Sequence, residues 1–198
     1  MTQHVMIDIE TMGTCRDAVI LSIGAVLFDR DKIYEDSGFY ENLSWQEQLD
    51  AGGTVTEGTI KFWMQQPSGP RDALFGKKGL SPNQAINKFN LWFRKQVQNP
   101  KDCNVWARGP SFDLSLLEDL YRRLDYGTPP WSYRAERCVR TAEMMPGVNT
   151  ISRPMNEPEH HAFHDAVHQA RVVRKFLIAC GGPAKPPKKE EIEDDLLG

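Results

Sequence analysis

The stretch that decides the fold is His4-Val5-Met6-Ile7-Asp8-Ile9-Glu10, near the start of the chain. Its apolar positions predict a buried strand that ends in acid. Side chains two apart on a strand lie on the same face, so Asp8 and Glu10 are expected side by side. Neighbouring carboxylates repel each other unless a cation lies between them, and hard oxygen ligands favour Mg²⁺ or Mn²⁺. Two solvated acids at an exposed strand end remain the simpler alternative.

Three further segments predict the rest of a sheet. Residues 19–28 are rich in β-branched side chains and indicate a second strand, and residues 33–43 indicate a third after a polar turn. Since consecutive strands usually pair, an antiparallel meander is the simplest arrangement of the first three. Residues 104–107 predict a short strand between helical segments. The pattern as a whole predicts an α/β fold, a mixed sheet flanked by helices.

Apolar side chains spaced three and four apart predict the helices. Ser44 followed by Glu47 predicts a capping box at a helix start. The clearest helix begins at Ser81-Pro82, and its apolar stripe consists of Ile86, Phe89, Trp92, Phe93 and Val97. Further helices are predicted at residues 56–64, 111–126, 139–145 and 161–180. Residues 67–80, with two Pro and three Gly, favour a surface loop.

The composition is that of a globular protein without a membrane span. Of 198 residues, 40% are hydrophobic and 26% are charged, and no long apolar run or secretion signal is present. Four scattered cysteines form no C-x-x-C pair. This disfavours a zinc ribbon or a disulfide framework and indicates reduced thiols. A cytoplasmic location is therefore expected.

The C-terminal residues differ in composition from the rest. From Lys185 onward there are three Lys and five Asp or Glu, which account for −2 of the net charge of −3. We therefore expect one domain at residues 1–182 and a disordered Pro/Lys/acidic tail at residues 183–198. The tail's apolar residues Ile192, Leu196 and Leu197 could dock on a protein partner. The body is close to neutral, so a nucleic-acid partner is not excluded by charge.

Two later segments add acids and histidines. Asp113 lies where a strand meets a helix, and it could bind a metal or simply favour the helix N-terminus. His160 precedes the last long helix and Asp165 lies within it. His160 could take a proton from water while Asp165 completes a metal site. His160, His164 and His168 also have a spacing suited to zinc, but no H-E-x-x-H pattern is present.

Together these segments resemble the DEDDh exonuclease superfamily, which includes proofreading exonucleases, oligoribonuclease and tRNA-trimming ribonucleases. The likeness spans roughly residues 4–180, and its motifs correspond to Asp8-Ile9-Glu10-Thr11, Phe112-Asp113, and His160 with Asp165. Any one of these motifs is weak, whereas five matched positions in order are specific.

Residues 20–26, 59–63 and 105–113 are most similar to the phage exodeoxyribonuclease A-like and mycobacterial exoribonuclease-like branch. The last stretch departs from that branch by having Arg108-Gly109 where Asn-Gly is expected. This leaves substrate contacts at Arg108 open.

The resemblance implies a ribonuclease H-like fold with a mixed five-stranded sheet, and a metal-dependent 3′–5′ exonuclease that releases 5′-mononucleotides. It implies that Asp8 bridges two Mg²⁺ ions, for which Mn²⁺ could substitute, while Glu10 and Asp165 complete one site and Asp113 supports the other. His160 would be the general base. It also places the protein in a bacterial or phage-infected host cytosol and makes a homodimer an expectation.

The partner implied is single-stranded DNA or RNA, with DNA slightly favoured. Thr11, Met12 and Gly13 would contact the terminal nucleotide, and Met12 and Phe112 would wedge against its base. A 3′–5′ exoribonuclease, a catalytically silent nucleic-acid-binding module of the same fold, and a zinc-dependent hydrolase are the alternatives. Core packing is favoured over base stacking for Trp63, Trp92 and Trp106.

Overall fold

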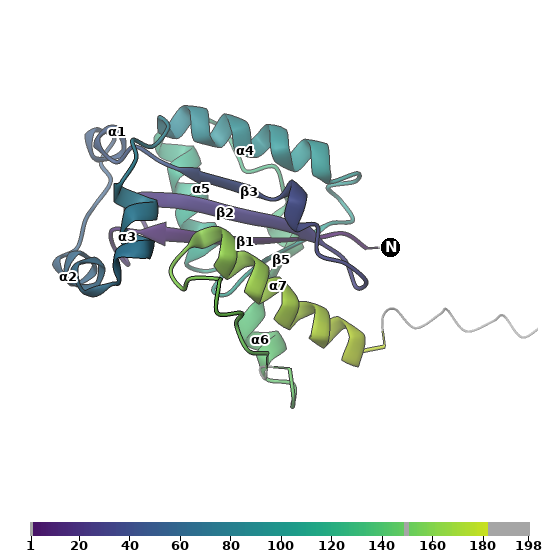
Figure 1. The fold of residues 1–198 in the computed structure, drawn as a ribbon. Helices are drawn as coiled ribbons and strands as arrows, with labels where there is room; N and C mark the ends of the chain where they lie inside the picture. The colour runs from purple at the N-terminus through teal and green to yellow at the C-terminus, as the bar shows by residue number, and fades with distance from the viewer. Residues whose placement is uncertain (1, 149–150, 182–198) are drawn as a thin grey trace, which may run out of the picture.

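Five strands form one mixed sheet in the computed structural model of the protein, which describes residues 2–148 and 151–181 (Figure 1). The strands are β1 (His4–Thr11), β2 (Ile20–Phe28), β3 (Phe39–Asn42), β4 (Asn104–Ala107) and β5 (Glu136–Cys138). Their order is β3-β2-β1-β4-β5. β1, β2 and β3 pair antiparallel, whereas β4 pairs parallel to both β1 and β5. The predicted five-stranded mixed sheet and its initial antiparallel meander are confirmed.

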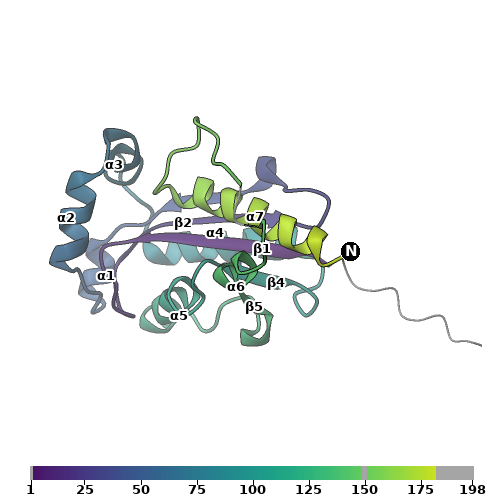
Figure 2. The ribbon, with the colours of Figure 1, turned by 90° about the horizontal axis from the view of Figure 1, so that it is seen from below.

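Helices cover both faces of the sheet (Figures 1 and 2). The elements α4 (Pro82–Gln96) and α5 (Asp113–Arg123) lie on one face, and α6 (Val139–Glu143) and α7 (Ala162–Ala179) lie on the other. At the end of the sheet where β1 stops lie α1 (Gln46–Asp50), α2 (Glu57–Gln65) and α3 (Ser68–Phe75). None of the helices in the described ranges is long and apolar enough to span a bilayer.

The side chains of β1 are divided between the two faces. Val5, Ile7 and Ile9 pack in the large apolar cluster with α4 and α5, whereas Met6 packs in the cluster with α7. Because side chains alternate along a strand, Asp8 and Glu10 emerge on the Met6 face. The strand therefore presents both acids toward α7.

Gly24 of β2 allows the start of α7 to approach the sheet closely. It is paired with Asp8 in the β1–β2 ladder. A Cβ atom at Gly24 would lie 2.2 Å from the carbonyl carbon of Ala162, so no other residue fits without displacing α7. The first turn of α7 consequently lies against the sheet at the level of Asp8.

The segment predicted as a surface loop contains α3, so that prediction was wrong for residues 68–75. Pro70 lies in the first turn of this helix, where a missing N–H costs no helical hydrogen bond. Leu74 is buried beside Leu21 and Trp63. Burial of this side chain outweighs the unfavourable Pro and Gly content.

Two other local predictions were also wrong. The N-cap of α1 is Trp45 without a side-chain cap, and the main-chain N–H of Ser44 donates to the carbonyl of Leu80 at 2.7 Å. The third strand is restricted to β3, since a 3₁₀ helix (Glu35–Ser37) interrupts the segment before it. A capping box does occur at Ser81, the start of α4.

The other long helices agree with the sequence pattern. In α4, Ile86, Phe89 and Phe93 are fully buried. Trp63 and Trp106 are buried and Trp92 packs against the core, as expected of core residues. The predicted domain end at residue 182 and the tail at residues 183–198 lie outside the described residues.

Candidate active site

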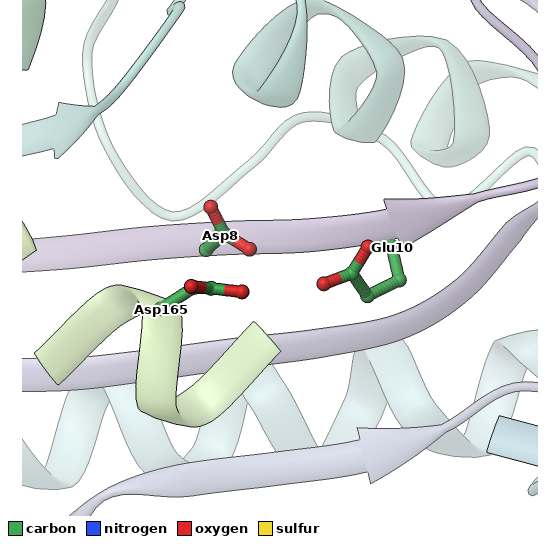
Figure 3. A group of neighbouring side chains, drawn as sticks. All are labelled: Asp8, Glu10 and Asp165. Carbon is green, nitrogen blue, oxygen red and sulfur yellow. The ribbon is translucent and has the colours of Figure 1, made fainter. Parts of the chain in front are cut away.

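Three carboxylates meet where the start of α7 crosses β1. Asp8, Glu10 and Asp165 each place one oxygen within 4.8 Å of the others. Asp8 and Glu10 extend from β1, and Asp165 points toward them from the first turn of α7 (Figure 3). Among the described residues no second group of three or more potential metal ligands is found.

Asp113 and His160 line the same hollow as these three acids. This acidic hollow has a volume of about 430 Å³, and its wall also includes Arg108, Gly109, Phe112, Arg140 and Gln169. Asp113 is 5% exposed, and its Oδ2 accepts a hydrogen bond from the N–H of Gly109 at 3.1 Å. The structure therefore brings the five predicted catalytic residues to one place.

Burial makes the ionised form of these acids costly. It raises the pKa of Asp8, as do the charges of Asp113, Glu10 and Asp165. Burial likewise raises the pKa of Glu10, with Asp165 and Asp113 adding to the effect. The pKa of Asp113 rises to about 6, again mainly through burial, although the N–H of Gly109 opposes this. The cluster is thus short of positive charge.

Asp8 and Asp165 are each held by specific donors. Gln169, one turn after Asp165 on α7, donates from Nε2 to Oδ1 of Asp8 at 2.7 Å. Asp165 accepts from the guanidinium of Arg153 and from the N–H of His161 at 3.1 Å. Gln169 is 5% exposed and its Oε1 has no partner among the described residues. The carboxylates of Asp8 and Asp165 are therefore oriented before any ligand binds.

His160 has a left-handed backbone, with φ of 59°, immediately before α7. Its ring packs edge-on against Phe62 at 4.9 Å and Trp63 at 6.2 Å between ring centroids. A positive φ is unfavourable for a residue with a side chain, so surrounding contacts must maintain it. Because of this backbone conformation, His160 does not continue the helical geometry of α7, and its side chain is not in line with the residues on one face of that helix.

The spacing of three histidines does not produce a zinc site. His160 lies outside α7, so it does not share a helical face with His164 and His168. The His164 ring lies 4.6 Å from that of His161, which stacks on Tyr40 at 4.2 Å. The zinc alternative has no set of converging ligands in the described chain.

A second hollow adjoins the first and shares Ile9, Glu10, Phe112 and His160 with it. This aromatic hollow also has a volume of about 430 Å³, and its other lining residues are Thr11, Gly13, Thr14, Thr56, Gly58, Thr59, Phe62 and Trp63. The indole N–H of Trp63 donates to the carbonyl of Thr11 at 2.9 Å, which fixes the end of β1 to α2. The two hollows form the ends of one groove.

Met12, which the sequence predicts as a substrate contact, does not line either hollow of this groove. Its side chain is 5% exposed and packs with Val19, Leu21 and Leu74. Its main-chain N–H and carbonyl are also engaged, with Val19 and Thr56. Alternation sends Met12 into this cluster, whereas Thr11, Gly13 and Phe112 border the groove.

Several groove residues were not singled out from the sequence. Gln169 and Arg153 contact the acids, and Phe62 and Thr59 line the aromatic hollow. Gln169 could have been found from its four-residue offset from Asp165 on one helix face. Phe62 and Thr59 lie in residues 59–63, which already carried the family likeness. No pattern in the sequence indicates Arg153.

The donor set fits a hard divalent cation. Three carboxylates converge, burial and the neighbouring acids raise the pKa values of Asp8 and Glu10, and the buried Oε1 of Gln169 can accept from a water on such an ion. Oxygen ligands of this kind suit Mg²⁺ and Mn²⁺.

Comparisons with known proteins agree with this geometry. The model of the Rv2179c-like 3′-5′ exoribonuclease domain matches residues 3–177. An exodeoxyribonuclease of Enterobacteria phage T4 is 23% identical over 215 residues, covering 95% of each chain.

Two solved structures have the same fold. The nuclease domain of 3′hExo, a DEDDh family member bound to rAMP, has a TM-score of 0.60 and 13% identity over 93% of this chain and 95% of that one. E. coli Exonuclease I with a dA16 oligonucleotide has a TM-score of 0.62 and 12% identity over 90% of this chain, which spans only 41% of that protein.

Proposed function

The chain belongs to the family of Rv2179c-like 3′-5′ exoribonuclease domains, within the DEDDh exonuclease superfamily, and we propose that it removes nucleotides from the 3′ end of single-stranded nucleic acid. The observation that supports this most directly is the three-acid group of Asp8, Glu10 and Asp165, placed at the junction of an aromatic and an acidic hollow. The products would be 5′-mononucleotides.

The acids would hold two divalent ions, Mg²⁺ or Mn²⁺. Asp8 would contact both, Glu10 and Asp165 would complete one site, and Asp113 would support the other through water. The ions would supply charge neutralisation and a more acidic water. The protein's own contribution is orientation, since Gln169 and the N–H of His161 hold Asp8 and Asp165 in position.

His160 would accept the proton of the attacking water. It borders both hollows and therefore lies beside the point where the scissile phosphate would sit. A neutral imidazole is a suitable base near pH 7. The rings of Phe62 and Trp63 limit its movement.

The aromatic hollow would receive the 3′-terminal nucleoside. Phe62 and Phe112 offer apolar surface to a base, and Thr11, Gly13 and Thr59 offer polar groups to a sugar. A base can enter only after leaving its stack and its complementary partner. This is why we propose a single-stranded end as the substrate.

The descriptions of the related proteins name two different sugars. The family description refers to RNA, whereas the phage T4 relative is an exodeoxyribonuclease. We retain DNA as slightly favoured. A 2′-hydroxyl would be read by the polar wall of the aromatic hollow.

A time course on 5′-end-labelled single-stranded DNA and RNA of one sequence tests the proposal. With Mg²⁺ or Mn²⁺ the label should move stepwise to shorter products, and mononucleotides should accumulate. Chelator or Asp8→Asn should stop the reaction. If the protein bound the strands but shortened them with neither Mg²⁺ nor Mn²⁺, it would be a catalytically silent binding module. If the labelled 5′ nucleotide were released as a mononucleotide at the first time points, degradation would run from the 5′ end.

A further inference from the structure

Two arginines line the acidic hollow at the end of the groove away from the aromatic hollow. Arg108 follows β4, and Arg140 lies in α6. In the described part of the chain they are the only Lys or Arg side chains that line either hollow. Neither is needed to orient the acids, because Gln169, Gly109 and Arg153 already do this.

The position of Arg140 depends on Gly109. A Cβ atom at Gly109 would lie 2.9 Å from Nη1 of Arg140, so the absence of a side chain makes room for the guanidinium. Arg140 forms no ion pair with any described residue, although its charge lowers the pKa of the nearby Asp113. Its donors therefore face the hollow without a fixed carboxylate partner.

Arg108 is only loosely held. One of its nitrogens lies 3.4 Å from Glu143, and its side chain is 50% exposed. Arg153 differs, because it pairs with Asp165 and also donates to the carbonyl of Pro158 at 3.1 Å. Arg108 and Arg140 thus retain donors for a ligand, whereas those of Arg153 are engaged within the protein.

The acids of the groove create a need for such donors. Metal ions would neutralise the scissile phosphate, but a nucleic-acid strand carries a further phosphate on its 5′ side. That phosphate would approach a wall rich in carboxylates and would be repelled unless cations met it. Arginine is well suited, because its planar fork can make two hydrogen bonds to a phosphate.

We propose that Arg108 and Arg140 form a subsite for the phosphodiester immediately 5′ of the bond that is cut. The inference rests on the proposed function. If the 3′-terminal nucleoside occupies the aromatic hollow and the scissile phosphate lies at the acids, the strand continues past Arg108 and Arg140. Arg108, which stands where the related branch is expected to have Asn, then has a role in substrate binding.

Dinucleotides with and without a 5′-phosphate test the subsite directly. The 5′-phosphate of a dinucleotide occupies the position of the next phosphodiester, so the wild type should hydrolyse the phosphorylated form about ten- to a hundredfold more efficiently in kcat/KM. Arg108→Gln combined with Arg140→Gln should remove most of this preference. Arg94→Gln combined with Lys95→Gln on α4, which makes the same charge change on the opposite face, should leave it intact.

Binding provides a second measurement that does not depend on turnover. In an Asp8→Asn background, the fluorescence anisotropy of a labelled oligonucleotide gives the binding constant K at several salt concentrations. The slope of log K against log salt concentration should become shallower by roughly 0.7 when both arginines are replaced. An unchanged phosphate preference and salt slope, with long strands still degraded, would overturn the subsite alone. Failure of the wild type to cut any strand would overturn the proposed function.

Discussion

The two faces of the central sheet are built for different purposes. The face covered by α4 and α5 holds the larger apolar cluster, which includes Phe89, Phe93 and Tyr121. The face covered by α7 holds a smaller cluster together with Asp8, Glu10 and Asp165, and burial makes the carboxylates of Asp8 and Glu10 costly to ionise. The first face therefore contributes most to the free energy of unfolding, whereas the buried acids on the second face reduce it. Substitutions on the two faces should have opposite effects on stability and activity.

The largest expected effect follows from Asp8→Asn on the acidic face. The substitution keeps an acceptor for Gln169 but removes a charge that would contact both metal ions, so kcat should fall by roughly a thousandfold or more. The thermal midpoint in chelator should stay equal or rise, because repulsion among the acids is reduced. Asp36→Asn, at an exposed residue away from the groove, serves as the control. An active Asp8→Asn protein would contradict the proposed mechanism.

Phe89→Ala on the opposite face should give the reverse outcome. Phe89 is fully buried and contacts Phe39 and Trp131. Its truncation should cost about 3–5 kcal/mol in the free energy of unfolding. Urea denaturation measures this, and kcat at a temperature where the variant is folded should change little. Leu91→Ala, at a residue 60% exposed on the same helix, is the matched control.

Gly24→Ala should lower both stability and activity, unlike the two substitutions above, which each affect mainly one of them. The added methyl group meets the backbone of Ala162 and must push the start of α7 outward, at a cost of roughly 1–3 kcal/mol. Asp165 would move with α7, so Mg²⁺ affinity measured by calorimetry should fall as well. Gly69→Ala in α3, where a Cβ atom meets nothing within 4 Å, should be neutral or slightly stabilising. A variant that lost stability but bound metal normally would refute this coupling.

The smallest effect expected is a pH dependence confined to the acidic face. Asp113 has a folded pKa of about 6, above its value of 3.8 when unfolded. The folded state therefore binds more protons between these values, and stability is greatest below pH 3.8 and is lost as pH rises through 6. For this group alone, the metal-free protein should lose about 1 kcal/mol or more between pH 5 and 7.5. Melting curves in chelator measure the loss. Saturating Mg²⁺ should offset it at pH 7.5, and Asp113→Asn should reduce it.

Much of the sheet and of the acid set could be predicted from the sequence, because both depend on periodicity. Alternation along residues 4–10 was enough to place Asp8 and Glu10 on one face, and the motif order implied that Asp113, His160 and Asp165 would join them. The side chain of Met12 could not be assigned correctly. Met12 is excluded from the groove because it packs in a cluster with Leu74. Leu74 lies in α3, a helix that the Pro and Gly content of residues 67–80 did not predict.

Contacts made by single long-range pairs could not be predicted in this way. Arg153 reaches Asp165 from a segment without regular structure, and Gly109 makes room for Arg140 across two elements. Such contacts follow from tertiary packing and leave no periodic trace in the chain. The metal identity, the catalytic roles and the sugar preference stay predictions for the experiments above.

The three-acid group joins residues from opposite ends of the chain, and this has a consequence during protein synthesis. Asp8 and Glu10 lie on the first strand, whereas Asp165 is synthesised only after all five strands of the sheet. A nascent chain, or one released before Ala162, contains two of the acids but lacks the helix that brings the third to them. The ability to degrade nucleic acid would therefore arise only after the first turn of α7 has been synthesised, and shorter products would lack it.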